Sequence, residues 1–268
     1  MERALGLMGG AGPLPPLVAA RARAQGWRVV AFAFDGADAV APHADRVIPS
    51  RITEVAPILA ALVEERVTAA VLVGRFAMTD VLRADRGRSD AAARRVEARA
   101  GSRADARLVG AVIGTLADLG VEVLDQRLFL GDLLAPAGCW TARPPTPAEW
   151  EQVRQGLALA RRLAEAGVGQ TVVLHHGAVT AVEAAEGTTE AIRRGTALGG
   201  AGAVIVKAPA PDHDYRVDTP LVGRETLAAA VAGAAAVVAV EAGRVALLDR
   251  AGCVADADAA GLTLVGVE

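Results

Sequence analysis

ALGLMGGAGPLPPLVAARARAQGWRVVAFAFDG, residues 4–36, is the stretch that decides the fold of this chain of 268 residues. Residues 4–8 and 28–34 are apolar runs of strand length, and each ends at a glycine-containing turn. Between them, Pro15 and Pro16 stand where prolines suit the first turn of a helix. The order strand, glycine loop, helix, strand predicts a βαβ unit with parallel strands.

The alternation of strand and helix continues through the first half of the chain. Helical periodicity over residues 53–65 and 105–119 alternates with apolar runs at 69–73 and 121–124. Such alternation is typical of an α/β domain, in which helices cover a mostly parallel sheet. We therefore expect residues 1–132 to form a Rossmann-like N-terminal domain.

A proline-rich segment, residues 133–147, reads LLAPAGCWTARPPTP and predicts a semi-rigid linker. Helix signals follow it directly: Thr146 as N-cap, Pro147 at the first helical position and Glu149 at the third. We place the domain boundary at this linker. Residues 148–268 are then a second domain, to which the chemistry is assigned below.

The second half alternates again and predicts a second α/β fold. A helix is expected to open near residue 188, with Thr188 or Thr189 as its N-cap. The other expected elements are strands at 171–175, 203–206 and 263–267, a hairpin partner at 178–184, helices at 148–166, 225–232 and near 255–260, and a hairpin of 236–240 with 244–248.

Composition excludes several classes of protein. Apolar residues make up 53% and aromatic residues 3%, which predicts a core of small aliphatic side chains. The 28 basic and 31 acidic residues nearly balance, so no global field favours nucleic acid. Cys139 and Cys253 are far apart and have no metal-binding spacing, as expected of thiols in a reducing cytosol. No signal-peptide pattern is present, and no apolar run reaches the roughly 18–20 residues of a membrane span.

The densest group of chemically useful side chains lies in residues 207–223, KAPAPDHDYRVDTPLVG. Prolines prevent a helix or a central strand there, and the stretch follows a buried apolar run. A rigid, charged loop that leaves a buried strand is where an α/β protein often carries its active residues. A solvated surface loop with turn-forming Asp and Pro residues is the alternative.

Two helix starts are candidates for binding a phosphate. Gly9, Gly10 and Gly12 precede the first helix, where backbone N–H groups and the helix dipole attract anions. This loop lacks the Lys and Ser/Thr of a P-loop and departs from the G-x-G-x-x-G spacing. Asp35 stands where a dinucleotide fold has its ribose-binding acid, so NAD or a nucleotide-sugar is an alternative ligand. The second start follows Glu186-Gly187-Thr188. A tight turn that needs small residues is the alternative to either site.

Eight pieces of sequence, in this order, carry a resemblance to a known family: LGLMGGAGPLP (5–15), LLAPAGCWTARPPTPAEW (133–150), VGQTVV (168–173), VEAAEGT (182–188), VKAP (206–209), RVDTPLVG (216–223), VEAGR (240–244) and LLD (247–249). The chain resembles the LpxI-type UDP-2,3-diacylglucosamine pyrophosphatases of lipid A biosynthesis over nearly its whole length. Each piece is weak alone, and their order and spacing together make the resemblance specific.

The resemblance implies a two-domain hydrolase that cleaves the pyrophosphate of UDP-2,3-diacylglucosamine to UMP and 2,3-diacylglucosamine 1-phosphate. It implies dependence on Mg²⁺ or another divalent cation. The family's key acid falls on Asp218, which is the catalytic candidate and the first metal ligand, with Glu186 as the second. The expected substrate-binding residues are Gly9, Gly10, Gly12, Gly74, Arg75, Gly187, Thr188, Lys207 and Arg216.

The resemblance also implies where the protein acts and with what. We expect a cytoplasmic protein that makes a peripheral contact with the inner face of the inner membrane, where its UDP-linked glycolipid substrate lies. A homodimer is compatible with this expectation, and nucleic acid is not a partner.

Four positions depart from the family's pattern inside the proposed site. Ala210 stands for a lysine, Thr189 for an acid and Leu221 for a threonine, and His213 takes the place of Asn or Gln. These departures leave open a paralogue that acts on another nucleotide-sugar, or a non-catalytic protein that senses one. The first βαβ unit with Asp35 leaves open a third alternative, a NAD-binding oxidoreductase.

Overall fold

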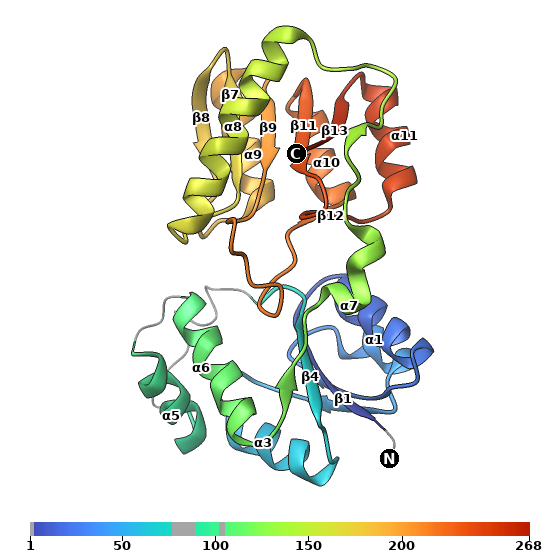
Figure 1. The fold of residues 1–268 in the computed structure, drawn as a ribbon, viewed down its shortest axis with the longest axis vertical. Coiled ribbons are helices and arrows are strands. Elements are labelled where there is room, and N and C mark those ends of the chain that lie inside the picture. The colour runs from blue at the N-terminus through green and yellow to red at the C-terminus, as the bar shows by residue number, and fades with distance from the viewer. Residues whose placement is uncertain (1–2, 77–88, 102–104) are drawn as a thin grey trace. The chain divides into compact units, whose positions relative to one another are not determined.

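The structure is a computed structural model that describes residues 3–76, 89–101 and 105–268. The chain divides into two compact units (Figure 1). Unit 1 comprises Met1–Leu130 and Asp214–Asp218, and unit 2 comprises Gly131–His213 and Thr219–Glu268. The tip of the charged 207–223 loop is thus counted with unit 1 and its two flanks with unit 2. The sequence-based boundaries, with a linker at 133–147, stay a prediction.

Unit 1 is a five-stranded sheet in the order β3-β2-β1-β4-β5, with every neighbouring pair parallel. Its strands are β1 (Ala4–Gly9), β2 (Arg28–Ala33), β3 (Arg46–Pro49), β4 (Ala69–Val73) and β5 (Glu122–Val123). Its helices are α1 (Leu14–Ala24), α2 (Ala37–Val40), α3 (Val55–Glu64), α5 (Ala91–Ala100), α6 (Asp105–Asp118) and α7 (Arg127–Leu130), with a 3-10 turn at Ala41–His43. This strand order confirms the Rossmann-like prediction.

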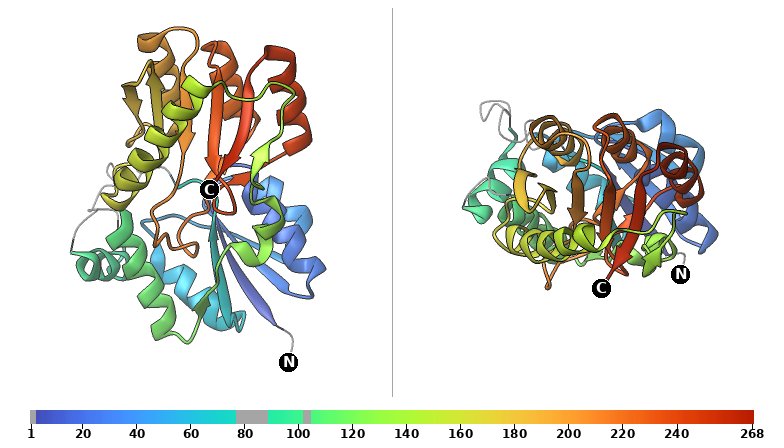
Figure 2. Two further views of the ribbon diagram at one scale, coloured as in Figure 1. Left: turned by 45° about the horizontal axis from the view of Figure 1, so that its top comes forward. Right: turned by 90° about the horizontal axis from the view of Figure 1, so that it is seen from above.

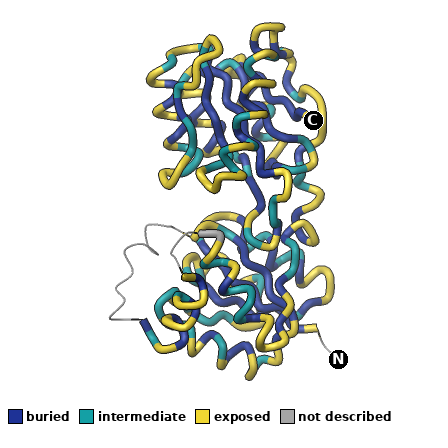
Figure 3. Tube along the Cα trace, turned by 60° about the vertical axis from the view of Figure 1, so that its left-hand side comes forward, coloured by how far each residue is buried: buried dark blue, intermediate teal, exposed yellow. Residues whose placement is uncertain are grey.

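The inner strands of unit 1 are apolar because both faces of the sheet are covered. All six residues of β1 are buried, as are all five of β4. Val30, Phe32 and Met8 pack with Leu62 of α3 and Leu116 of α6 in one cluster. Parallel strands covered by helices on both faces are expected to read as continuous hydrophobic runs rather than as alternating ones. Figure 3 shows the buried strands inside each unit.

Unit 2 is built on a six-stranded mixed sheet in the order β6-β13-β11-β9-β7-β8. Its strands are β6 (Gly138–Cys139), β7 (Thr171–His175), β8 (Ala178–Val182), β9 (Val204–Lys207), β11 (Val237–Glu241) and β13 (Thr263–Val267). Its helices are α8 (Pro147–Glu165), α9 (Thr188–Gly199), α10 (Arg224–Ala232) and α11 (Arg250–Ala260), with a 3-10 turn at Gly131–Leu133. A separate parallel pair joins β10 (Leu221–Val222) to β12 (Ala246–Leu247). The second α/β domain is therefore confirmed as a fold.

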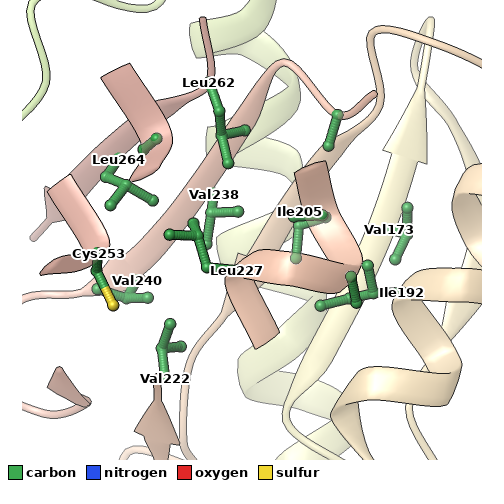
Figure 4. Packing of buried hydrophobic residues seen from close by; sticks show 14 of the residues in the cluster. Val173, Ile192, Ile205, Val222, Leu227, Val238, Val240, Cys253, Leu262 and Leu264 are labelled. Atoms are coloured by element: carbon green, nitrogen blue, oxygen red, sulfur yellow. The ribbon is translucent and has the colours of Figure 1, made fainter. Parts of the chain in front are cut away.

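Three parallel strands, β9, β11 and β13, form the centre of this sheet, and antiparallel strands flank them. Side chains alternate between the two faces along each strand. Ile205 and Val238 pack toward Leu227 of α10 and Ile192 of α9 (Figure 4). Residues of the other face, such as Val206, pack with α8. The right-hand view of Figure 2 shows the strands of this unit between α8 and the α9–α11 layer.

Of the two N-caps predicted in unit 2, that of α8 is confirmed and that of α9 is wrong. The capping box at α8 is present: the hydroxyl of Thr146 accepts from the Glu149 amide, and Glu149 accepts from the Thr146 amide. The N-cap of α9 is Gly187, not Thr188 or Thr189. Gly187 adopts a φ of 84°, which favours glycine, so the helix begins one residue earlier than predicted and Thr188 lies inside its first turn.

The predicted hairpin around Glu241-Ala242-Gly243 is wrong. β11 pairs with β9 and β13, both parallel to it, and β12 pairs with β10 instead. The physical reason is burial: all five residues of β11 are buried, which suits a central parallel strand better than a hairpin arm. Among the helices, α11 begins at Arg250, earlier than the expected start near residue 255.

No helix among the residues described is long and apolar enough to cross a membrane.

Two helical glycines test this packing in opposite directions. A Cβ at Gly195 of α9 would lie 2.6 Å from Cβ of Val173, whereas a Cβ at Gly110 of α6 would meet nothing within 4 Å. Gly195→Ala should lower the free energy of unfolding by about 1–3 kcal/mol through overpacking. Gly110→Ala should raise it by about 0.5–1 kcal/mol, because alanine favours the helix. Urea unfolding followed by circular dichroism measures both, and a Gly195→Ala protein as stable as the parent would contradict the packing described.

Candidate functional site

The carboxyl edge of the parallel strands in unit 2 carries three buried or half-buried charged residues. Lys207 ends β9 and lies in register with Thr171 of β7 and Val240 of β11. Glu183 follows the last residue of β8, and Glu241 ends β11. Because β7 runs antiparallel to β9, its first residue lies at this same edge. Ligand sites of open α/β sheets are commonly found outside this edge.

Lys207 is 6% exposed and holds a polar cluster on the α9 side of the sheet. Its Nζ donates to the hydroxyl of Thr188 at 2.8 Å and to that of Thr171 at 3.5 Å. It also lies 3.7 Å from Oε2 of Glu183. The Thr188 hydroxyl in turn donates to Oε1 of Glu183 at 2.7 Å. A buried ammonium group thus has a carboxylate partner and two hydroxyl acceptors, as the low-dielectric interior requires.

Glu183 is ionised in this cluster at neutral pH. Its burial acts to raise the pKa of the carboxyl group, but the charge of Lys207 opposes that effect. Hydrogen bonds from the hydroxyls of Thr171 and Thr188 and from the Gln170 amide also favour the carboxylate. The net result is a pKa below the ordinary value of 4.5.

A second cluster lies on the opposite face at the same edge. Glu241 follows Val240 along β11, so its side chain points to the face that α8 covers. Its Oε1 accepts from Nη2 of Arg161 at 2.6 Å and from Nη1 of Arg244 at 3.3 Å. Arg244 also donates through Nη2 to the carbonyl oxygens of Ala210 and Pro211. The backbone of the charged loop is therefore fixed at its root, directly after β9.

The tip of the loop carries Arg216 and Asp218 in unit 1. Nε of Arg216 lies 3.0 Å from Oδ1 of Asp214, and its Nη2 lies 2.7 Å from Oδ2. This pairing with Asp214 raises the pKa of the guanidinium group. The side chain of Asp218 is exposed, two residues further along the chain. A short turn thus presents a paired arginine and an exposed carboxylate together.

The glycine loops of unit 1 are held against one another by backbone bonds. The Ala11 amide donates to the carbonyl of Arg75, and the Arg75 amide donates to the carbonyl of Ala11. A Cβ at Gly10 would lie 2.6 Å from the Arg75 carbonyl oxygen, and Gly74 has a φ of 91°. Close backbone approach accounts for both of these glycines without a ligand. Gly9 ends β1, and Gly12 has open space around its Cβ position.

Glu186, the second metal candidate, is part of a surface ion pair. Its Oε1 accepts from Nη2 of Arg194 at 2.6 Å. A hydrogen bond from its own backbone amide and the bond from Arg194 lower the pKa of its carboxyl group. Within residues 3–76, 89–101 and 105–268, no three acidic, histidine or cysteine side chains are grouped to hold a metal ion.

The structure brings together only part of the predicted set. Lys207 and Thr188 share one cluster, next to Gly187 and Glu186 in sequence. Gly9, Gly10, Gly12, Gly74, Arg75, Arg216 and Asp218 belong to unit 1. Glu183, Glu241, Arg161 and Arg244 were missed by sequence reasoning. An available signal was the placement of Glu183 and Glu241 at the ends of apolar strands, in the quoted pieces VEAAEGT and VEAGR.

A shallow hollow of about 670 Å³ in unit 1 includes Arg216 in its lining. Ile113, Val121, Leu124 and Leu128 supply apolar surface, and Arg127 adds a second guanidinium group. Glu122 and Asp125 line it as well, so two carboxylates balance the two guanidinium groups.

Comparisons with known proteins cover the whole chain. Residues 4–133 match the family described as LpxI N-terminal domain, and residues 136–265 match LpxI C-terminal domain. The chain is 33% identical, over 284 aligned residues, to UDP-2,3-diacylglucosamine pyrophosphatase LpxI of Caulobacter vibrioides, covering 99% of this chain and 98% of that protein. Among solved structures, glycinamide-RNase-transformylase T from Mycobacterium tuberculosis aligns at 18% identity with a TM-score of 0.25, covering 66% of this chain and 43% of that one, which is too distant to carry an argument.

The Lys207–Glu183 pair predicts a pH-dependent stability. The pKa of Glu183 is lower in the folded than in the unfolded chain, so its contribution is complete above about 4.5 and is lost as pH falls through the folded-state pKa. Glu183→Gln should lower the free energy of unfolding by about 3–5 kcal/mol at pH 7, because it leaves the buried ammonium group of Lys207 without its carboxylate partner. This loss of unfolding free energy should shrink as pH falls through the folded-state pKa of Glu183, because the carboxylate of the parent protein is then itself protonated.

Urea unfolding of the parent protein and of Glu183→Gln, from pH 7 into the acid range, measures the effect. Glu190→Gln is the matched control, since Glu190 and Arg193 form an exposed ion pair on α9. It should lower the free energy of unfolding by less than about 1 kcal/mol. Equal costs for Glu183→Gln and Glu190→Gln at pH 7 would contradict the assignment of the buried pair.

Proposed function

This chain belongs to the LpxI family, and from that premise we propose that it hydrolyses the pyrophosphate bond of UDP-2,3-diacylglucosamine. The products are UMP and 2,3-diacylglucosamine 1-phosphate, an intermediate of lipid A biosynthesis. The observation that carries the proposal is the relationship to the Caulobacter vibrioides pyrophosphatase, which extends over both units and includes the charged loop. The enzyme class follows from the same relationship.

Pyrophosphate hydrolysis needs positive charge and a positioned water, and the described residues can supply both. Charge on the two phosphate groups repels an attacking water, so cationic groups near the phosphate oxygens lower the barrier. Arg216 would hold phosphate oxygens through the guanidinium edge that Asp214 leaves open, in a two-pronged contact. Asp218, as the exposed carboxylate of the same turn, would orient the attacking water and accept its proton.

Lys207 has a role that differs from a simple phosphate ligand. Because its ammonium group already bonds Thr188 and faces Glu183, it would stabilise the first turn of α9 and add positive potential there. The backbone N–H group of Thr188 at this helix start would then donate to substrate oxygens, whereas Gly187, whose amide donates to the carbonyl of Ala184 at 3.1 Å, would let the substrate approach the backbone. Gly9, Gly10, Gly12, Gly74 and Arg75 remain proposed contacts of the substrate in unit 1.

A divalent cation, Mg²⁺ in our proposal, fits the donor set in a restricted way. Mg²⁺ in phosphate sites is usually held by one or two carboxylates together with substrate oxygens and waters. Asp218 meets that requirement as an exposed carboxylate, and Glu186 would have to exchange its bond from Arg194 to serve as a second ligand. When bound, the cation would screen phosphate charge and make the attacking water more acidic.

The substrate class implies a location. A UDP-linked glycolipid lies at a membrane surface, so we propose a cytoplasmic enzyme that contacts the inner membrane peripherally. The hollow beside Arg216 has apolar walls, which supports a substrate with an apolar part. Homodimer formation remains a proposal.

The rival readings have less support. The NAD-binding oxidoreductase finds none in these comparisons, and Asp35 engages its own turn, where its Oδ1 accepts from the Gly36 amide at 2.7 Å. A paralogue with another nucleotide-sugar substrate, or a sensor, would rest on the departures at Thr189, Ala210, His213 and Leu221.

The direct test is incubation with UDP-2,3-diacylglucosamine and Mg²⁺, with UMP detected by mass spectrometry. We expect UMP and 2,3-diacylglucosamine 1-phosphate in equal amounts, and EDTA should abolish their formation. Absence of UMP at high protein concentration would overturn the proposed reaction. A rate that EDTA leaves unchanged would overturn only its metal dependence.

A further inference from the structure

Two turns of identical pattern meet in unit 1. One is Asp214-Tyr215-Arg216 at the tip of the charged loop, and the other is Asp125-Gln126-Arg127 at the start of α7. In each turn the arginine amide donates to Oδ1 of the aspartate two residues earlier, at 3.0 and 2.8 Å. In each, Nη2 of the arginine also donates to Oδ2, at 2.7 and 2.6 Å. Two separate segments therefore adopt the same Asp-x-Arg geometry.

Residues of the two turns contact one another directly. The Gln126 amide donates to the carbonyl of Tyr215 at 3.0 Å, and the guanidinium carbon of Arg127 lies 4.0 Å from the centre of the Tyr215 ring. Gln126 is 2% exposed and Tyr215 is 5% exposed, so the backbone bond and the ring are buried, whereas the Arg127 side chain covers the ring from the solvent side. A guanidinium group over an aromatic face is an attractive arrangement that gains strength when water is excluded.

The charges of the two turns also act on each other. The carboxylate of Asp214 acts to raise the pKa of Asp125, although the bonds from Arg127 leave that pKa below its ordinary value. The carboxylate of Asp125 helps to raise the pKa of Arg216. Each acid thus has its own arginine, and the attraction between Asp125 and Arg216 offsets the repulsion between the two acids.

The contact between the two turns positions Asp218. The Val217 amide donates to the carbonyl of Asp214 at 3.0 Å, which closes the turn, and Asp218 is the next residue. The loop root is fixed in unit 2 by Arg244 through the carbonyl groups of Ala210 and Pro211. Within unit 1, the contact with Arg127 therefore sets the position of the turn that carries Asp218.

We propose that the Asp125-Gln126-Arg127 turn is a receptor for the loop tip, and that Arg127 is a positioning residue for hydrolysis. The inference rests on the proposed function. Arg127 acts through Tyr215 and the turn, and Asp218 acts on the substrate. Loss of Arg127 therefore misplaces the carboxylate without removing any group that reacts.

Tyr215 makes the test direct, because it is the only tyrosine of the chain. Protein labelled with 3-fluorotyrosine gives a single ¹⁹F resonance, which reports the loop tip alone. Arg127→Met should move this resonance toward that of the free amino acid. The same variant should lower kcat on the order of tenfold or more, since misplaced groups lose rate, and should also raise KM, because Arg216 of the same turn is displaced together with Asp218. Arg127→Lys, which keeps a cation over the ring but loses the fork to Asp125, should fall between.

Arg99→Met is the matched control. Arg99 pairs with Asp118 in the same unit, and its side chain is 47% exposed, against 46% for Arg127. It should leave both the resonance and kcat at the parent values. An Arg127→Met resonance at the parent position overturns the docking. A moved resonance with parent kcat overturns the positioning role. If the parent protein releases no UMP, the proposed function fails, and the resonance alone decides whether the tip docks on this turn.

Discussion

The buried charge of Lys207 is the constraint on which the arrangement in unit 2 depends. An ammonium group that is 6% exposed needs a counter-ion, and Glu183 supplies it from the end of β8 while Thr188 supplies an acceptor from α9. Three consecutive elements, β8, α9 and β9, must therefore meet at one edge of the sheet. The same residue is the first of the charged loop, so the pair that secures the edge also fixes where the loop begins.

Beyond Lys207, ion pairs and hydrogen bonds hold the loop at further points, in addition to apolar packing. Glu241 gathers Arg161 and Arg244 on the opposite face of the sheet, and Arg244 holds the loop carbonyl groups. Further along, the chain contributes Asp214–Asp218 to unit 1 and then returns to unit 2 at Thr219. A segment rich in prolines suits this path, because it loses less conformational entropy when it is ordered. The acid proposed for catalysis lies in the part of the loop that has the most charged neighbours.

Local patterns predicted most elements, although the N-cap of α9 is Gly187 rather than Thr188 or Thr189. The βαβ unit followed from apolar runs and glycine placement, and the α8 capping box from Thr146 and Glu149. Pairing between strands depends on tertiary burial, so β11 was taken for a hairpin arm although it is a central parallel strand. The partners of Lys207 and Tyr215 come from distant segments, and spacing along one chain does not reveal such meetings. The sequence also does not show whether Gly10 and Gly74 bind a phosphate, since close backbone approach requires glycine at both positions in either case.

The central claim is that the loop tip performs the chemistry through Asp218. Single-turnover hydrolysis of UDP-2,3-diacylglucosamine by Asp218→Asn, beside Asp212→Asn as an exposed acid of the same loop, tests it most directly. The account predicts that Asp218→Asn loses on the order of a hundredfold or more in rate, with unchanged thermal stability, and that Asp212→Asn stays near the parent rate. An Asp218→Asn protein that hydrolyses the substrate at the parent rate would contradict it.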